Sequence, residues 1–357
     1  MIWLALVRAS HGRFRMRTRF ALLGALALTT TLLFGQAPQA APQPAKAPAK
    51  AAAKSWKVAR TPEGVPDLQG FWTNSTLTPL ERPKALGSKE FYTDEEVAAA
   101  QKKDRDRLAL NVAEGLPTEP GTAADVHYDF AQFGLDKAQS SLVWDKRTSL
   151  IIGPTGTIPA LLPEARKRAA DIAAKNRGHE FDGPENRPLS ARCIILGYDA
   201  VPMLPQGYNN NLQIQQGQGY VTILHEMNHS ARVIPTNGQP HAPNGIPQLR
   251  GDSKGHWEGD TLVVDVSNFT NYNPFRGSGD KLHVVERFTR VDTDTILYRF
   301  TVEDPATWDQ PWTAELAMTK TNGPIYEFGC HEGNYGLANT LHGARVAEQE
   351  AAKKAGK

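Results

Sequence analysis

The C-terminal half of the chain alternates hydrophobic and polar residues with the period of two that is typical of half-buried strands. His283–Arg290 and Thr295–Val302 alternate on either side of the turn residues Asp292–Asp294. Thr261–Val266 is apolar almost throughout, as in a strand buried on both faces, and Trp312–Thr319 alternates again. Successive strands joined by short turns predict an antiparallel sheet, closed as a barrel or packed as a sandwich.

The N-terminal half predicts a few helices outside that sheet. Thr93 with Glu96 forms a capping box, and it predicts a polar, Ala-rich surface helix over Asp94–Leu108. Pro163 suits the first position of a second helix that ends near Asn176. The predicted fold class is therefore mainly β, an antiparallel barrel or sandwich with a few peripheral N-terminal helices.

One five-residue stretch carries a metal-site pattern, since His225–His229 spells H-E-x-x-H. On a helix the two histidines share a face and can bind one Zn²⁺, while Glu226 can act as base on a metal-bound water. In this interpretation the protein is a zinc-dependent hydrolase with His225 and His229 as metal ligands.

The surroundings of that stretch favour strands instead. Tyr220–Leu224 is dense in β-forming residues, and no N-cap precedes it. A zinc site of two histidines and a glutamate also needs a further glutamate nearby, and none occurs between Glu226 and Glu258. We therefore predict no cofactor and a hairpin of Gln218–Glu226 and Ser230–Pro235, with the M-N-H triplet near its tip. His225 is then the motif residue that matters least.

The ends of the chain read as targeting and linker segments. Residues 1–41 resemble a secretory signal peptide, with Met16 as a possible true start, and residues 42–55 form an Ala/Pro/Lys linker. We predict a single β-rich domain over 56–345 and a disordered tail over 346–357. The expected location is periplasmic or secreted, without stable membrane insertion after signal cleavage. The alternative is an uncleaved first helix that tethers the protein to a membrane.

The charge distribution argues against a nucleic-acid partner. Residues 1–60 hold ten of the 40 basic residues and none of the 38 acidic ones, so the remaining chain has 30 basic and 38 acidic residues. A mildly acidic folded part does not suit a nucleic acid or an anionic membrane surface. A small-molecule ligand is the expected partner, and the oligomeric state stays open.

The two cysteines, Cys193 and Cys330, predict one disulfide in an oxidising compartment. Two buried free thiols are the alternative. A disulfide at Cys330 would hold the adjacent His331 and Glu332 rigidly, which suits a binding site.

Polar residues in the predicted loops and hairpin supply the other candidate groups. Asp252, Ser253 and Glu258 stand among glycines in a predicted loop, where Trp257 could line a pocket. Glu226 and Arg232 could form an ion pair across the hairpin. The candidate catalytic residues are Glu226, His229 and Glu332, and the candidate ligand-binding residues are Arg232, His241, Asp252, Ser253, Trp257, Glu258 and His331.

Some chemistries have no support in the sequence. No G-x-G-x-x-G, P-loop or C-x-x-C pattern occurs. Gly251–Gly255 spells G-x-S-x-G, but Ser253 there follows Asp252 and lacks the nucleophile elbow of a catalytic serine. Nicotinamide, nucleotide and α/β-hydrolase functions are therefore not expected.

Several runs together carry a family resemblance. The runs PDLQGFW, TPLERP, ARVIPTNGQPH, GDSKGHWEGDTLVVDVSNF, ERFTRVD and CHEGNY occur in this order. They resemble a family of exported bacterial proteins of unknown function that is frequent in acidobacteria, and the likeness covers about Pro66 to Arg345. The resemblance implies membership without an activity, and in that family other residues can stand at the His225 position.

The favoured function is binding or processing of a small organic or sugar-like ligand in a polar pocket. The Glu226–Arg232 hairpin, the His241–Glu258 loop and the Cys330–Tyr335 loop would line that pocket. In an enzyme, Glu226 or Glu332 would be the acid or base, with a histidine as its partner. The alternatives are the zinc-dependent hydrolase and a non-catalytic binding module of the cell envelope.

Overall fold

The computed structural model describes residues 56–113, 146–153, 155–197, 199–243, 246–272 and 275–356. The chain divides into two units, Met1–Ala53 and Lys54–Lys357, and the described residues belong to the second. The predicted signal peptide and linker lie outside the described residues.

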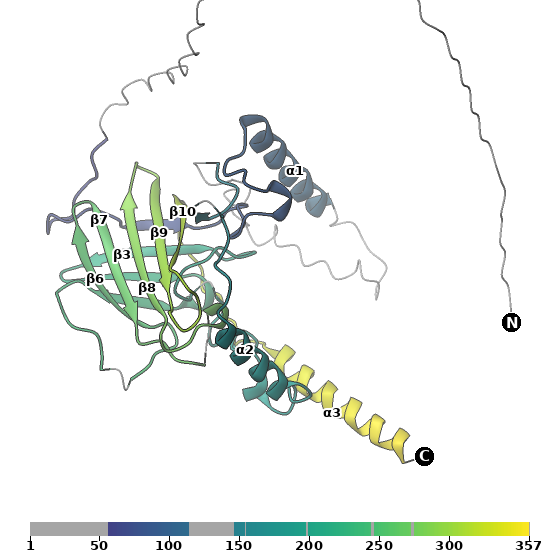
Figure 1. The fold of residues 1–357 in the computed structure, drawn as a ribbon. Helices are drawn as coiled ribbons and strands as arrows, with labels where there is room; N and C mark the ends of the chain where they lie inside the picture. The colour runs from purple at the N-terminus through teal and green to yellow at the C-terminus, as the bar shows by residue number, and fades with distance from the viewer. Residues whose placement is uncertain are drawn as a thin grey trace, which may run out of the picture. The chain divides into compact units, whose positions relative to one another are not determined.

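Antiparallel strands form the central sheet of the described fold (Figure 1). Most follow the predicted periodicity, and β8 and β9 begin at the predicted residues. The strands are β1 (Gly70–Thr73), β2 (Ile151–Ile152), β3 (Asn211–Gly217), β4 (Tyr220–His225), β5 (Ala231–Pro235), β6 (Asp252–Glu258), β7 (Thr261–Ser267), β8 (His283–Arg290), β9 (Thr295–Glu303) and β10 (Trp312–Lys320).

Nine of these strands form a nearly closed barrel. Their order is β5-β4-β3-β1-β10-β9-β8-β7-β6, and the short β2 pairs with β10 outside this path. The N-terminal β1 joins two groups of consecutive strands, because Trp72 pairs with Leu212 of β3 on one side and with Lys320 of β10 on the other. The barrel half of the predicted fold class is thereby confirmed.

The first and last strands of this order, β5 and β6, meet at a seam. They lie side by side, but no backbone ladder joins these two described strands. Gly255 permits the close approach, because a Cβ there would lie 2.9 Å from Cγ2 of Ile234. The side chains of Arg232 and Ser253 bridge the seam with a hydrogen bond of 2.9 Å. Side-chain packing therefore closes the barrel where hydrogen-bonded pairing stops.

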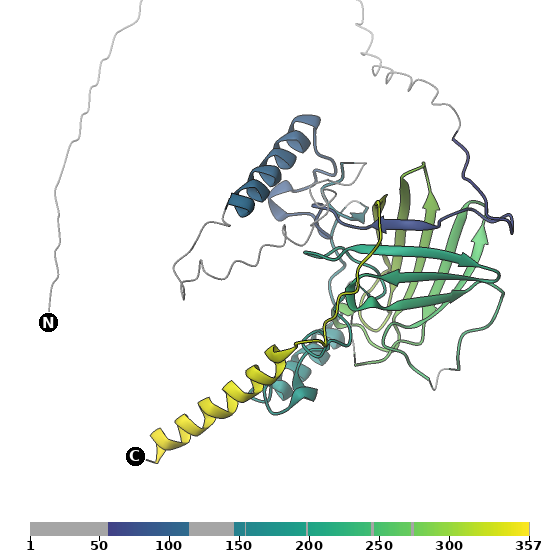
Figure 2. The ribbon, with the colours of Figure 1, turned by 180° about the vertical axis from the view of Figure 1, so that it is seen from behind.

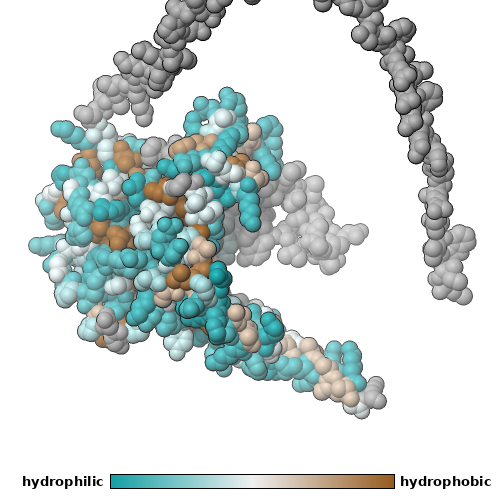
Figure 3. All heavy atoms as spheres, in the orientation of Figure 1, coloured by the Kyte–Doolittle hydropathy of each residue, from teal (hydrophilic) through white to brown (hydrophobic). Residues whose placement is uncertain are grey.

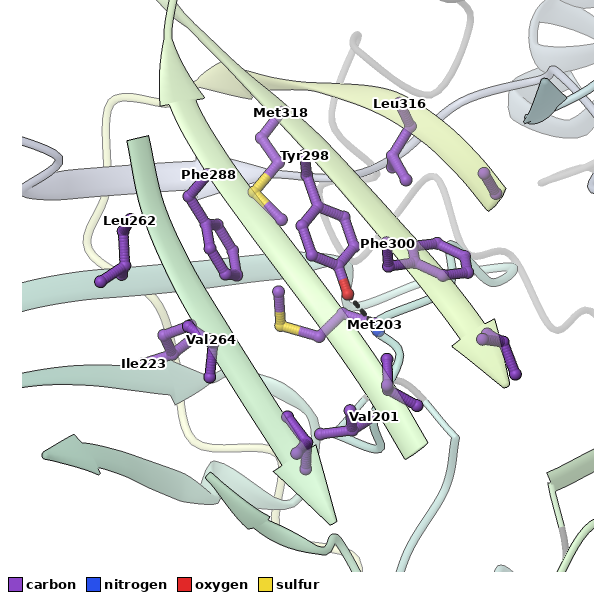
Figure 4. Close-up of a cluster of buried hydrophobic side chains, with 14 of the residues drawn as sticks. Val201, Met203, Ile223, Leu262, Val264, Phe288, Tyr298, Phe300, Leu316 and Met318 are labelled. Atoms are coloured by element: carbon purple, nitrogen blue, oxygen red, sulfur yellow. Dashed lines mark hydrogen bonds between the residues drawn. The ribbon is translucent and has the colours of Figure 1, made fainter. Parts of the chain in front are cut away.

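Side chains fill the barrel interior. Phe288, Tyr298 and Phe300 are fully buried on neighbouring strands, and their rings lie 4.9 and 5.5 Å apart. Figure 4 shows Met203, which precedes β3, beside these rings, with Val201 nearer one end of the strands. Aromatic and aliphatic side chains at this density form a packed core. A ligand site is therefore to be sought at the ends or on the outside of the barrel.

Helices lie outside the barrel. The capping box at Thr93 is confirmed, since its backbone N–H donates to Glu96 and the N–H of Glu96 donates back to the Thr93 hydroxyl. The α-helices are α1 (Asp94–Ala113), α2 (Pro163–Asn176) and α3 (Tyr335–Ala355), and the short 3₁₀ helices are η1 (Lys84–Leu86), η5 (Pro184–Asn186), η6 (Met227–His229) and η7 (Phe275–Gly277).

The C-terminal segment differs from its prediction. Residues 346–355, expected in a disordered tail, continue α3. Asn334 caps the helix by accepting from the N–H of Leu337, and the residues that follow are rich in the strong helix formers Ala, Glu and Lys. The predicted domain end at 345 therefore falls inside a helix.

A strap of residues 321–334 connects β10 to α3. Figure 2 shows it in yellow, running past the teal strands toward α3. Its start is held by the N–H of Thr321, which donates to the carbonyl of Phe71. Its end is held by the predicted disulfide, Cys193–Cys330, which is confirmed. The strap is thus attached to the barrel at one end and to the segment before β3 at the other.

The surface is mixed in character. On the face shown in Figure 3, polar side chains predominate and hydrophobic ones form small separate patches. Among the described helices, none combines the length and hydrophobicity that crossing a membrane requires.

Candidate functional site

The H-E-x-x-H stretch is the end of a strand followed by a tight turn. His225 ends β4, Glu226 begins the turn, and Asn228 and His229 both have left-handed backbone angles, with φ of 56° and 48°. β5 then pairs back along β4. The predicted hairpin is confirmed. The helix that would put His225 and His229 on one face is not present in this stretch.

Glu226 lies at one end of the barrel with its carboxylate almost fully buried. Only 7% of the residue is exposed. Its Oε1 accepts a hydrogen bond of 2.9 Å from the side-chain amide of Asn209. Its Oε2 is buried without a hydrogen-bond partner among the described residues. Buried carboxylate oxygens are normally satisfied, and this one can still accept a hydrogen bond.

The backbone of Glu226 is fixed on both sides. Its N–H donates to the carbonyl of Asn211 over 3.0 Å, and its carbonyl accepts from the N–H of Phe328 in the strap over 3.3 Å. The Phe328 ring lies 6.1 Å from that of Tyr208, next to Asn209 in sequence. The strap therefore passes directly over the Glu226 turn.

His225 points into the barrel and is also incompletely satisfied. It is 4% exposed, and its Nε2 has no hydrogen-bond partner among the described residues. Burial lowers the pKa of His225 to about 4; nearby Asp199 opposes this shift, and Arg232 and Arg250 add to it. The imidazole is therefore neutral at neutral pH and can either donate or accept one hydrogen bond at Nε2.

An ion pair between Asp199 and Arg250 fixes the neighbouring loops. Asp199 is buried, accepts from the N–H of Leu196 over 3.0 Å and forms a short contact with the Arg250 guanidinium. The Arg250 Nε also donates to the Asp199 carbonyl over 2.7 Å. Asn228 in the hairpin turn lies 3.4 Å from the same carboxylate. The pair joins the segment before β3, the loop before β6 and the hairpin turn at one end of the barrel.

Arg232 belongs to a buried network inside the barrel. Its guanidinium pairs through two nitrogens with both carboxylate oxygens of Glu286. The Tyr298 hydroxyl donates to the same carboxylate over 2.6 Å and accepts from the N–H of Met203 over 3.0 Å, the contact drawn in Figure 4. Burial, and then the Glu286 charge, raise the pKa of Tyr298 well above 10. The network is internally satisfied and serves the packing of the core.

The predicted ion pair between Glu226 and Arg232 is therefore wrong. Arg232 points into the barrel, where Glu286 of β8 is its partner, while Glu226 has left the strand and pairs with Asn209. Glu226 lies in the turn and no longer follows the alternation of β4. Its side chain therefore does not project to the same side as that of Arg232.

The predicted loop around Asp252 is also wrong, because these residues form β6. Gly259 and Asp260 turn the chain directly into β7. The glycines that suggested a loop serve other purposes: Gly255 sits at the tight seam, and Gly259 adopts a φ of 59° in the turn. Trp257, expected to line a pocket, packs partly buried against the core.

A cluster of charged residues covers the outer face of this sheet. His241 lies between two carboxylates, with Nδ1 3.0 Å from Asp252 and Nε2 2.9 Å from Asp265. Asp265 also bonds His283, which projects to the opposite face from Glu286 as the alternation predicts. Burial raises the pKa of Asp252, but donation from the Ala242 N–H, His241 and Lys254 outweighs it, and the net effect is a lowered pKa. These partners hold the loop before β6 to the barrel wall.

Glu258 lies apart from Glu226, exposed on the outside of the barrel. It pairs with Arg287 at 2.8 Å and with His256 at 3.1 Å, and the hydrogen bond from Arg287 is the main reason that its pKa is lowered. His331 and Glu332 are also exposed, and neither side chain forms a hydrogen bond or ion pair with another described residue. His229 is exposed too.

The predicted site residues thus fall into separate places. Glu226 and His225 lie at one end of the barrel, Arg232 and Ser253 in its interior, and His241, Asp252 and Glu258 on its outer face. The site residues predicted from the sequence did not include Asn209, Asp199, Arg250, Tyr298 or Glu286. Only Glu286 had a usable signal, because it is an acid on the apolar face of an alternating strand.

The described part of the chain holds no group of three or more His, Cys, Asp or Glu side chains placed to bind a metal ion. No protein-family model, curated protein or solved structure matches this chain. The family resemblance of the sequence stays a prediction.

Proposed function

We propose that the protein binds a small hydroxylated organic molecule, such as a sugar, at the end of the barrel where Glu226 lies. One observation carries the proposal: the buried Glu226 carboxylate is fixed through Oε1 by Asn209, while its Oε2 has no partner among the described residues. A positioned acceptor of this kind is expected where a ligand donates a hydrogen bond.

A hydroxyl group suits the polar atoms at this end of the barrel. Arg232 and Arg250 are already paired with Glu286 and Asp199. Oε2 of Glu226 and Nε2 of His225 are buried without a partner among the described residues. A hydroxyl group can donate to Glu226 and also accept from or donate to the neutral His225. A polyol presents several such groups close together.

The aromatic pair beside Glu226 supports the same class of ligand. Tyr208 and Phe328 lie with ring centroids 6.1 Å apart and planes inclined at 49°. Small-molecule sites commonly combine apolar surfaces of this kind with a few fixed polar groups. Since Phe328 belongs to the strap, entry of the ligand to Glu226 would involve displacement of the strap.

The location remains part of the proposal. The Cys193–Cys330 disulfide supports a periplasmic or secreted protein, because such bonds persist in oxidising compartments. Catalysis by Glu226 as an acid or base would be a further step on the same bound molecule.

Binding can be tested by saturation-transfer NMR with a panel of monosaccharides and polyols. Glu226→Gln keeps the shape and the contact to Asn209 but removes the charged acceptor, so a bound ligand is expected to lose about 10- to 100-fold in affinity. Glu258→Gln is the matched control, since it makes the same charge change on the outer face and should bind normally. A panel without any binder, or equal affinity in Glu226→Gln and wild type, would overturn the proposal.

A further inference from the structure

A second concave site lies near the same end of the barrel and has a different character. It is a cleft of about 250 Å³, here called the Arg276 cleft. Its walls are mainly apolar, with Arg276 and Gln206 as the polar exceptions. The lining residues that matter for the argument are Ala200, Val201, Gln206, Phe275, Arg276 and Leu282.

Arg276 is the unusual member of this cleft. It is exposed, and its guanidinium has no ion pair or hydrogen bond with another described residue. Arg232 and Arg250, by contrast, are both engaged with buried carboxylates. Arg276 also has a left-handed backbone, with φ 52° and ψ 36°. Such a conformation is unfavourable for a side-chain-bearing residue and is often found at functional positions.

The surrounding structure holds Arg276 in this conformation. The carbonyl of Phe275 accepts from both the N–H of Ser278 at 3.0 Å and its hydroxyl at 2.6 Å. The Phe275 ring stacks on Trp312 of β10, with centroids 6.1 Å apart and planes inclined at 22°. The base of the Arg276 side chain is therefore positioned by the core before any ligand arrives.

The opposite side of the cleft is also fixed. Gln206 is held by Asn210, which accepts from its N–H at 2.8 Å and donates to its carbonyl at 2.9 Å. Val201 packs into the core beside the cleft. The nearby carboxylate of Asp199 is buried and neutralised by Arg250, so it does not compete for Arg276. Arg276 is thus a cation without a partner among the described residues, at the edge of an apolar surface.

We propose that the Arg276 cleft binds a small monocarboxylate with an apolar body, such as an aromatic or short-chain aliphatic acid. The guanidinium would take the carboxylate through two parallel hydrogen bonds, and the apolar walls would cover the body. A cavity of about 150 Å³ admits a benzene ring, and pockets for larger organic ligands start near 300 Å³. The cleft therefore fits one ring or a short chain. One arginine among apolar walls suits a single negative charge better than a phosphate.

This site is independent of the proposed polyol site, because none of the residues that line it is His225, Glu226 or Asn209. Isothermal titration calorimetry with benzoate and hexanoate tests it, with benzamide and hexanamide as uncharged counterparts. The acids are expected to bind at one equivalent, and the amides about 10- to 100-fold more weakly.

Three variants sharpen the test. Arg276→Asn removes the charge with a residue that tolerates the left-handed backbone, and it should weaken benzoate about 10- to 100-fold. Lys281→Asn is the matched control, since it removes an exposed positive charge beside Leu282 but outside the cleft, and it should bind normally. Ala200→Leu narrows the cleft and should weaken acids and amides alike, with thermal unfolding as the check on folding.

The outcomes separate cleanly. Preference for acids, lost in Arg276→Asn and retained in Lys281→Asn and Glu226→Gln, supports the proposal. Absence of benzoate and hexanoate binding at millimolar concentration overturns it. Equal affinity for acid and amide, or unchanged affinity in Arg276→Asn, also overturns it.

Discussion

The partner of a charged residue on β8 depends on the face of the strand from which its side chain projects. Glu286 and His283 stand three positions apart on β8, so one is paired with Arg232 in the core and the other with Asp265 outside. This separation was predictable from alternation. The partner of Arg232 was not, because it comes from a strand 54 positions away and only the barrel brings the two together.

Burial of neutral His225 should make stability depend on pH. The folded protein keeps this imidazole neutral down to about pH 4, whereas an exposed one protonates near 6.5. Between these values the unfolded chain binds more protons, so stability falls as the pH is lowered through this window. The loss from His225 is about 3 kcal/mol in total. Urea unfolding of wild type and His225→Gln at about pH 7 and about pH 4 should show a smaller loss in the variant. Parallel losses in both would contradict this prediction.

The buried pair of Arg232 and Glu286 should show strong coupling. Arg232→Met or Glu286→Leu alone leaves an uncompensated buried charge and should cost about 3–5 kcal/mol. The double variant removes both charges and should recover much of the loss, as measured by a double-mutant cycle of urea unfolding. Strict additivity of the two single changes would show that the charges do not act as a pair.

At the scale of elements, strands with a clear alternation of apolar and polar residues were predictable from the sequence. Strands whose residues are determined by contacts with a neighbouring strand were not. β8 starts and ends at the predicted residues, because its apolar face packs on a single core. β6 was mistaken for a loop, because Gly255 has to be small where β5 and β6 meet without a backbone ladder. The steric need for a small residue at this position becomes apparent only when the barrel places β5 next to β6.

The hairpin turn between β4 and β5 offers a test of the backbone. His229 is exposed and has φ 48°, a conformation that costs an ordinary residue about 1–2 kcal/mol. His229→Gly should therefore match or slightly exceed wild type in thermal stability, and His229→Val should lose about 1–2 kcal/mol. A lower melting temperature for His229→Gly than for His229→Val would contradict the assigned turn.

At the scale of the whole molecule, the disulfide and the strap connect regions that the sequence keeps far apart. The disulfide spans a sequence separation of 137 residues, so removing it should cost about 4–5 kcal/mol in the chain-entropy model. The pairing was predictable from the presence of two cysteines in a chain whose N-terminal residues resemble a signal peptide. That the strap crosses the Glu226 turn was not, because it depends on the strand order.

Removal of the disulfide should lower the stability of the whole protein and loosen the strap. In Cys193→Ala/Cys330→Ala, the free energy of unfolding measured in urea should be about 4–5 kcal/mol lower. Hydrogen exchange should rise at the strap, residues 321–334, more than in β7–β9. The same changes should appear in wild type after reduction, and reductant should leave the double variant unaltered. Equal exchange in the strap with and without the disulfide would show that other contacts hold it.

The position of β1 between β3 and β10 has a kinetic consequence. A chain synthesised from its N-terminus produces β1 first, yet one of its two neighbours ends at Lys320. The strands β3–β5 can form from local hairpins, and so can the strands β6–β10. The two groups can join through β1 only after β10, the last strand, has been synthesised. Barrel closure is thus a late event governed by contacts of long sequence separation. It should set the slow step of folding on the millisecond-to-second scale common to β-rich proteins.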